Sequence, residues 1–108
     1  MPAFNYAAAL QAADPEIIDI MAAPFLAALP QYLQDIETAA SEQRHSDLRR
    51  HAHTLKGLAG NFGAEPIVSL SHTIEELGKQ EQSAEAQPLL TTLKNELREF
   101  ITVLSASA

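Results

Sequence analysis

Apolar residues recur three or four positions apart along most of this chain, and no segment alternates between apolar and polar residues as a strand does. Toward the N-terminus the recurring positions are Ile17, Met21, Leu26, Leu29, Leu33 and Ile36. Toward the C-terminus they are Leu89, Leu90, Leu93, Leu97, Phe100, Ile101 and Leu104. Each set forms one stripe along a helix, so the pattern predicts an all-α protein.

Helix start and stop signals divide this pattern into four main segments. Asp14 can cap the first helix, and Pro15 suits its first turn, where a backbone N–H is not needed. Ser83 is expected to cap the last helix, and residues 61–63 are typical of a turn. We therefore expect helices at about residues 14–40, 46–61, 65–79 and 84–104.

Two prolines, Pro24 and Pro30, lie inside the first long segment. Each removes one backbone hydrogen bond, so we expect a kink or a break there. A shorter amphipathic piece from Phe4 to Ala12 precedes the four main segments. Short loops between helices favour an antiparallel four-helix bundle, here with a short extra N-terminal helix and residues 1–108 forming one domain.

Composition narrows the classes of protein. The chain has no cysteine, which excludes disulfides and thiolate metal sites. Its first residues lack the basic and apolar regions of a signal peptide, and its longest apolar run, residues 20–29, is interrupted by a proline and too short to span a bilayer. We expect a cytoplasmic protein without membrane contact, and the net charge of −7 argues against nucleic acid as a partner.

One segment departs from this acidic background. Between residues 44 and 60 there is a single carboxylate, Asp47, against four cations, which are Arg44, Arg49, Arg50 and Lys56. At about 100° per residue, the apolar positions of this segment fall on one side, and Arg49, His53, Lys56, Gly57 and Gly60 fall on another. The pattern therefore places His53 on a basic face with few bulky side chains, away from the core. From spacing alone, a solvated surface histidine is the plain alternative.

The other three histidines carry weaker signals. His51 lies about 160° around the helix from His53, so the two cannot chelate one metal ion, and no metal site is expected. His45 lies at a loop end, where we expect it to be solvated. His72 shares a helix face with Glu75, and a polar flank of the bundle is the simpler interpretation of that pair.

The order of residues around His53 resembles the histidine-containing phosphotransfer (HPt) domain family of bacterial two-component phosphorelays. The family pattern is a histidine, two residues, Lys-Gly, a small-residue stretch with a further glycine, and a helix with leucine-type and acidic residues. In this chain the matching positions are His53, Lys56, Gly57, Gly63, Leu70, Ile74 and Glu75. The resemblance covers nearly the whole chain and is sharpest between residues 49 and 79; the departures are Ile74 in place of leucine and an early Pro66.

The resemblance implies a relay in which His53 accepts a phosphoryl group from a receiver-domain aspartate and passes it to another. Lys56 would stabilise charge, while Gly57 and Gly60 would allow a receiver to approach closely. One of the two polar residues on the next helix, His72 or Glu75, is expected to orient the imidazole of His53.

The implied partners are response-regulator receiver domains and a hybrid sensor kinase. Their docking surface would include the two basic residues Arg49 and Arg50 and, from the N-terminal piece, Tyr6 and Leu10; a core role is the alternative for that piece. The resemblance implies a monomer with no cofactor of its own and Mg²⁺ on the receiver.

Other classes of function fit less well. A histidine kinase needs a nucleotide-binding domain with glycine-rich motifs, and this chain shows none. No second nucleophile, base or metal site supports a phosphatase. A helical adaptor that lost the relay would be expected to lack His53 or Lys56, and both are present. The chain could act alone or as the HPt module of a hybrid sensor histidine kinase.

Overall fold

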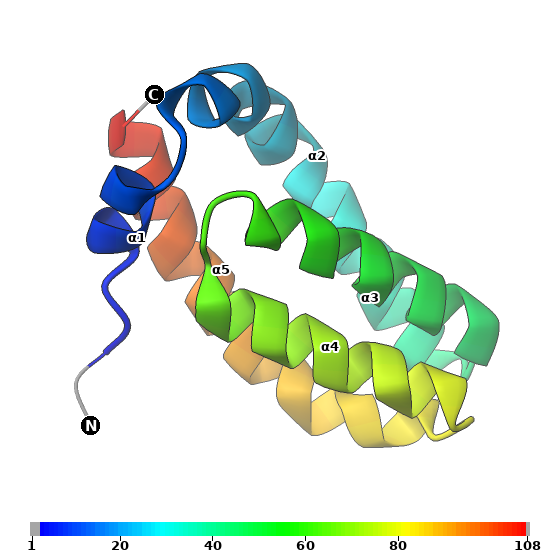
Figure 1. The fold of residues 1–108 in the computed structure, drawn as a ribbon. Coiled ribbons are helices and arrows are strands. Elements are labelled where there is room, and N and C mark those ends of the chain that lie inside the picture. Colours follow the sequence, from blue (N-terminus) through cyan, green and yellow to red (C-terminus); the bar gives the residue numbers. More distant parts are fainter. Residues whose placement is uncertain (1–2, 108) are drawn as a thin grey trace.

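The computed structural model describes residues 3–107, and every regular element in that range is helical. The elements are α1 (Tyr6–Ala12), α2 (Pro15–Ser41), α3 (His45–Gly60), α4 (Glu65–Lys79), a 3₁₀ helix (Ser83–Ala86) and α5 (Gln87–Ser107). In Figure 1, α3 and α4 lie side by side, α2 and α5 pack against them, and α1 lies across one end near the C-terminus of α5. The predicted all-α class is confirmed.

Helix α2 has the predicted length and is continuous. It runs without a break from Pro15 to Ser41 through both Pro24 and Pro30, so the predicted interruption is wrong in so far as it meant a break. The two prolines are exposed, whereas Phe25 and Leu29 lie in the core. Burial of that face holds the helix together where its backbone ladder lacks two hydrogen bonds.

By length and composition alone, α2 is also the one helix in residues 3–107 that could cross a membrane, with an 18-residue window of mean hydropathy 1.2. The apolar run inside it is shorter, but the helix continues through both prolines. Its buried residues belong to the protein core, as expected for the amphipathic core helix of a bundle.

Of the two predicted helix caps, one is confirmed and one is wrong. Asp14 caps α2 as expected, and its side chain accepts a hydrogen bond from the Glu16 N–H at 2.9 Å. Ser83 does not cap α5; it opens the 3₁₀ helix, and its buried hydroxyl lies 2.5 Å from Nδ1 of His45. The expectation that His45 is solvated is therefore wrong, because its ring joins the start of α3 to the 3₁₀ helix.

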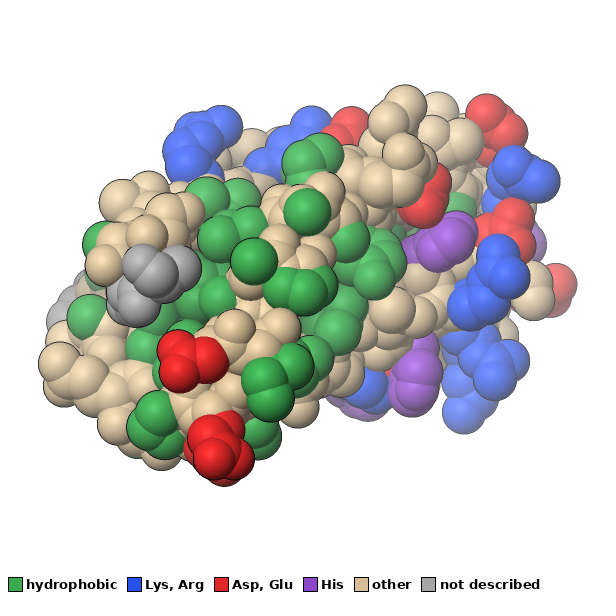
Figure 2. All heavy atoms as spheres, turned by 90° about the horizontal axis from the view of Figure 1, so that it is seen from above, with side chains coloured by type: hydrophobic (Ala, Val, Ile, Leu, Met, Phe, Trp, Pro, Cys, Tyr) green, Lys and Arg blue, Asp and Glu red, His purple; other side chains and the backbone are tan. Residues whose placement is uncertain are grey.

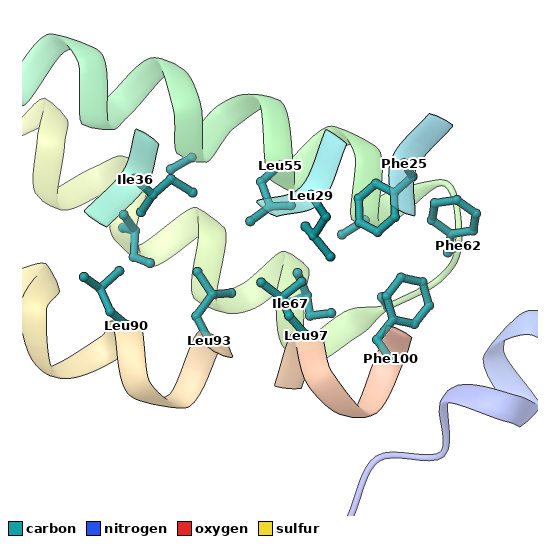
Figure 3. Packing of buried hydrophobic residues seen from close by; sticks show 14 of the residues in the cluster. Phe25, Leu29, Ile36, Leu55, Phe62, Ile67, Leu90, Leu93, Leu97 and Phe100 are labelled. Carbon is teal, nitrogen blue, oxygen red and sulfur yellow. The ribbon is translucent and has the colours of Figure 1, made fainter. Parts of the chain in front are cut away.

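The core occupies the space between α2, α3, α4 and α5 and is shown in Figure 3. Three rings meet at one end of it: Phe25 lies 5.3 Å from Phe62 and 5.9 Å from Phe100, and the last two are 5.5 Å apart, measured between centroids. Phe62 belongs to the turn after α3, so this aromatic cluster fastens that turn to α2 and α5. Because α4 begins directly after this turn, the position of the turn also sets where α4 starts beside α3.

Candidate functional site around His53

Helix α3 has two sharply different faces. Leu48, Ala52, Leu55 and Ala59 are fully buried, which confirms the predicted apolar stripe. On the other side, the side chain of His53 is 67% exposed. The helix therefore presents its central histidine to solvent, and no burial penalty opposes a partner's approach to the ring.

Glu75 of α4 connects the two functional residues predicted on α3. One carboxylate oxygen, Oε2, lies 2.8 Å from Nδ1 of His53. The other, Oε1, accepts a hydrogen bond from Nζ of Lys56 at 2.6 Å. Lys56 is thus connected to the histidine through Glu75, a link that the spacing of His53 and Lys56 within one helix did not predict.

These contacts have a defined electrostatic consequence. Burial alone would raise the pKa of the Glu75 carboxyl, since only 14% of its side chain is exposed. Hydrogen bonds and positive charge from Lys56 and His53 outweigh that effect and lower the pKa below its usual value. Glu75 is therefore ionised at neutral pH, and an ionised carboxylate can only accept hydrogen bonds.

The geometry dictates the protonation pattern of the ring. When His53 is neutral, its proton must be on Nδ1 to meet the Glu75 carboxylate, which leaves the lone pair on Nε2. In the part of the chain that the structure describes, Nε2 has no hydrogen-bond partner. The site thus offers an exposed nitrogen nucleophile whose second nitrogen is held by a carboxylate.

His72, the other candidate for orienting the imidazole, lies at the margin of this network. Its Nδ1 is 4.0 Å from Oε1 of Glu75, beyond hydrogen-bond distance, and its side chain is 58% exposed. Of the two polar residues predicted near His53, the structure therefore places Glu75 in contact with the ring and His72 behind the carboxylate.

A hollow with charged walls adjoins the histidine. It has a volume of about 440 Å³ and is lined by Ser46, Asp47, Arg49, Arg50, His53 and Glu75. Arg50 pairs with Asp47 at 3.3 Å, whereas Arg49 makes no ion pair with any residue between 3 and 107. Figure 2 shows lysine, arginine and histidine side chains, mixed with aspartate and glutamate, toward the end where α3 begins. Asp47 and Glu75 also line the hollow, and each is paired with a cation. Among residues 3–107 the lining therefore keeps one unpaired full charge, that of Arg49, which can attract an anionic group.

The two glycines predicted to give access do face open space. A Cβ atom added at Gly57 or at Gly60 would meet no atom within 4 Å outside the neighbouring helical backbone. Gly63 has a different role, because its φ of +66° is a left-handed conformation that side chains disfavour, and it closes the turn after α3.

The structure corrects one part of the predicted docking surface. Tyr6 and Leu10 are only 3% and 5% exposed, so their side chains belong to the core and do not form a contact surface. Tyr6 donates a hydrogen bond to Glu96 at 2.5 Å and packs against Phe100. Burial and the hydrogen bond to Glu96 raise the pKa of the Tyr6 hydroxyl, which stays protonated.

The exposed side of α1 borders a second hollow instead. Phe4, Ala8, Ala12, Gly60 and Gly63 are among the residues that line it, and its volume is about 640 Å³. Phe4 is 38% exposed, and most residues of α1 are alanine. The hollow extends to Gly60 at the C-terminal end of α3. The apolar surface near the histidine helix is therefore built mainly from small side chains, together with the ring of Phe4.

Within residues 3–107, no group of three or more histidine, aspartate or glutamate side chains is placed to hold a metal ion.

A family model of the Hpt domain matches residues 21–105 of the chain. The chain belongs to the Hpt domain family. Members of this family carry phosphoryl groups in phosphorelays and interact with the receiver domains of response regulators. A search of curated proteins and a search of solved structures each found no significant match.

Membership in the Hpt family gives this domain a general role in phosphorelays, and the matched residues include α3 and α4 in full.

Two features of the site around His53 were not predicted from the sequence. The bond from Lys56 to Glu75 crosses between helices, and sequence spacing within one helix carries no signal for it. The close packing at Gly78 of α4 was also missed, although a glycine inside a helix was a visible signal.

Proposed function

We propose that this Hpt domain accepts a phosphoryl group on Nε2 of His53 from a receiver-domain aspartyl phosphate and passes it to a second receiver aspartate. One observation carries the proposal: an exposed imidazole whose Nδ1 is engaged by Glu75 and whose Nε2 is free to attack. Neutral imidazole is a nucleophile near neutral pH.

In the forward step, the Nε2 lone pair attacks phosphorus and the bond from phosphorus to the aspartate oxygen breaks. The receiver regains its carboxylate, and the positive charge that develops on the ring lies beside the Glu75 carboxylate. In the second step, the carboxylate of another receiver attacks phosphorus and the nitrogen–phosphorus bond breaks. The ring returns to its starting state with its Nδ1 proton in place.

The surrounding residues fit the approach of an anionic partner. Arg49 and Arg50 line the hollow beside His53, where they can meet the acidic active site of a phosphorylated receiver. Gly57 leaves its part of the surface free of side chains. Phosphoryl transfer depends chiefly on alignment and charge stabilisation, and Lys56 with Glu75 supports both from one side of the ring.

We also propose which metal ion, donor and compartment the reaction uses. Mg²⁺ would be held by the receiver, and the Hpt domain itself would need no cofactor. The donor would be the receiver of a hybrid sensor kinase in a bacterial two-component system, and the transfer would take place in the cytoplasm with the Hpt domain as a monomer.

The direct test uses a receiver domain carrying a radioactive aspartyl phosphate. The wild-type protein should take up label that is lost in acid and retained in base, as expected for phosphohistidine. His53→Gln should take up none while keeping its helix content and melting temperature, because the side chain is exposed.

His72→Gln is the matched control, since His72 is similarly exposed but does not contact His53. Label on His45, His51 or His72 would refute the site. Receiver binding without any labelling would support an adaptor in place of a carrier.

A further inference from the structure

The backbones of α3 and α4 approach each other closely at Gly78, outside the recognised motif. A Cβ atom at Gly78 would lie 2.8 Å from the backbone nitrogen of Arg49 and 2.9 Å from the carbonyl oxygen of His45. It would also lie 3.1 Å from the Cα atom of Arg49. All three are backbone atoms of α3, so no side-chain rotation can relieve the overlap, and any side chain at this position forces the helices apart.

The backbone conformation of Gly78 does not explain the glycine. Among residues 3–107, Gly63 is the only glycine with a positive φ. Helix α4 continues past Gly78 to Lys79, and the left-handed residue that ends it is Glu81. A glycine in this position costs about 1 kcal/mol of helix propensity relative to alanine. Close packing against α3 is the structural feature that compensates for this cost.

The register of the two helices brings this contact next to the functional site. Arg49 precedes His53 by one helical turn, and Gly78 follows Glu75 by three residues. The helices run in opposite directions (Figure 1), so the Gly78 contact lies one turn from the bond between His53 and Glu75. At 2.8 Å and 2.6 Å, the two bonds of Glu75 lie where a separation of a few tenths of an ångström weakens them.

We propose that Gly78 is a positioning residue for His53. The absence of a side chain at Gly78 lets α4 approach α3 closely enough for Glu75 to hold Nδ1 of His53 and Nζ of Lys56. Glu75 then keeps the proton on Nδ1 and the lone pair on Nε2. The consequence for phosphotransfer rests on the proposed function, whereas the effect on the ring and on Glu75 does not.

The test compares Gly78→Ala with Gly57→Ala in the full chain by NMR. Nitrogen-15 shifts of the imidazole report the tautomer of His53, and carbon-13 shifts of the Glu75 carboxyl report its titration. In the wild type, neutral His53 should carry its proton on Nδ1. Gly78→Ala should move it toward the Nε2-protonated form and raise the pKa of Glu75 toward its usual value.

Gly57→Ala is the matched control, because its Cβ meets no atom within 4 Å outside the neighbouring helical backbone. It should leave the tautomer and the Glu75 titration as in the wild type. An unchanged tautomer and an unchanged Glu75 titration in folded Gly78→Ala would overturn the proposal.

Overpacking could unfold the single variant, since crowding a packed interface costs about 1–3 kcal/mol. In that case the double variant Gly57→Ala/Gly78→Ala is compared with Gly57→Ala alone. The Gly57→Ala substitution should add about 1 kcal/mol of helix stability, which helps to keep the double variant folded. A bundle that fails to fold in both backgrounds assigns Gly78 to folding alone and overturns the positioning role.

Transfer from a phosphorylated receiver is measured separately. It should fall several-fold in Gly78→Ala, in parallel with the tautomer shift. If the tautomer shifts as expected but the wild type accepts no phosphoryl group, the proposed function fails and the positioning role of Gly78 stands.

Discussion

At the scale of single residues, the site depends on Glu75 because this one carboxylate serves two partners at once. It fixes the proton of His53 and neutralises Lys56, and its own low pKa follows from those two contacts after they overcome the effect of burial. The side chains of His53 and Lys56 are 67% and 26% exposed, so the network lies at the protein surface, open to a partner on one side.

The lowered pKa of Glu75 makes the stability of the protein depend on acidity. A carboxyl whose pKa is lower in the folded state stabilises the fold fully above its unfolded pKa, near 4.5, and the contribution is lost as the pH falls through the folded pKa. Between pH 6 and pH 3 the wild type should therefore lose more free energy of unfolding than Glu75→Gln does. Urea titrations at several pH values measure this; parallel losses would show that the network adds nothing to stability.

At the scale of helices, three of the ends share one device. A left-handed residue follows α2, α3 and α4, at Gln43 (φ 53°), Gly63 (φ 66°) and Glu81 (φ 58°). In each case two backbone N–H groups donate hydrogen bonds to carbonyl oxygens of the last helical turns. One example is the bond from the Gln82 N–H to the Leu77 carbonyl oxygen at 2.8 Å. Only the end of α3 uses the glycine that this conformation favours.

Replacing Glu81 by glycine should therefore stabilise the protein. A left-handed conformation costs a residue with a side chain about 1–2 kcal/mol, and glycine avoids that cost. Glu81→Gly should raise the free energy of unfolding by about 1 kcal/mol in thermal or urea denaturation. Gln80→Gly is the control: its φ of −87° is ordinary, so glycine there should only destabilise.

At the scale of the whole molecule, α1 closes the end of the bundle nearest the turn after α3. Its two faces do different things. The inner face packs Tyr6 against Phe100 with ring centroids 5.3 Å apart, and it buries Leu10. The outer face, with Ala8, borders the hollow next to Gly60. We predict that a receiver docked at His53 also contacts the outer face, while the inner face holds α1 in place.

Two substitutions in α1 separate these roles. Ala8→Lys should change stability by less than about 0.5 kcal/mol, because the residue is exposed in a helix, and should weaken receiver binding by obstructing the hollow. Leu10→Ala should cost about 2–5 kcal/mol by leaving a cavity. Melting curves and receiver titrations of both variants measure the difference. Full receiver affinity in Ala8→Lys would remove α1 from the docking surface.

Much of this architecture is determined by the sequence through local periodicity. The stripes of apolar residues predicted the helices, and the angular position of His53 opposite Leu48, Ala52, Leu55 and Ala59 predicted its exposure. Such predictions succeed because positions within one helix follow from its 3.6-residue turn, whatever packs against it. The break that local reasoning allowed at Pro24 and Pro30 is absent, because burial of one face holds α2 continuous.

Only the tertiary structure decided which residues meet across helices. The sequence left His72 and Glu75 as equal candidates for orienting His53, and it suggested that Tyr6 and Leu10 were free for docking. The register of α4 against α3 places Glu75 on the imidazole, and the docking of α1 buries the other pair. Register and separation are set by the packing of all the helices together, so no single segment of sequence contains them.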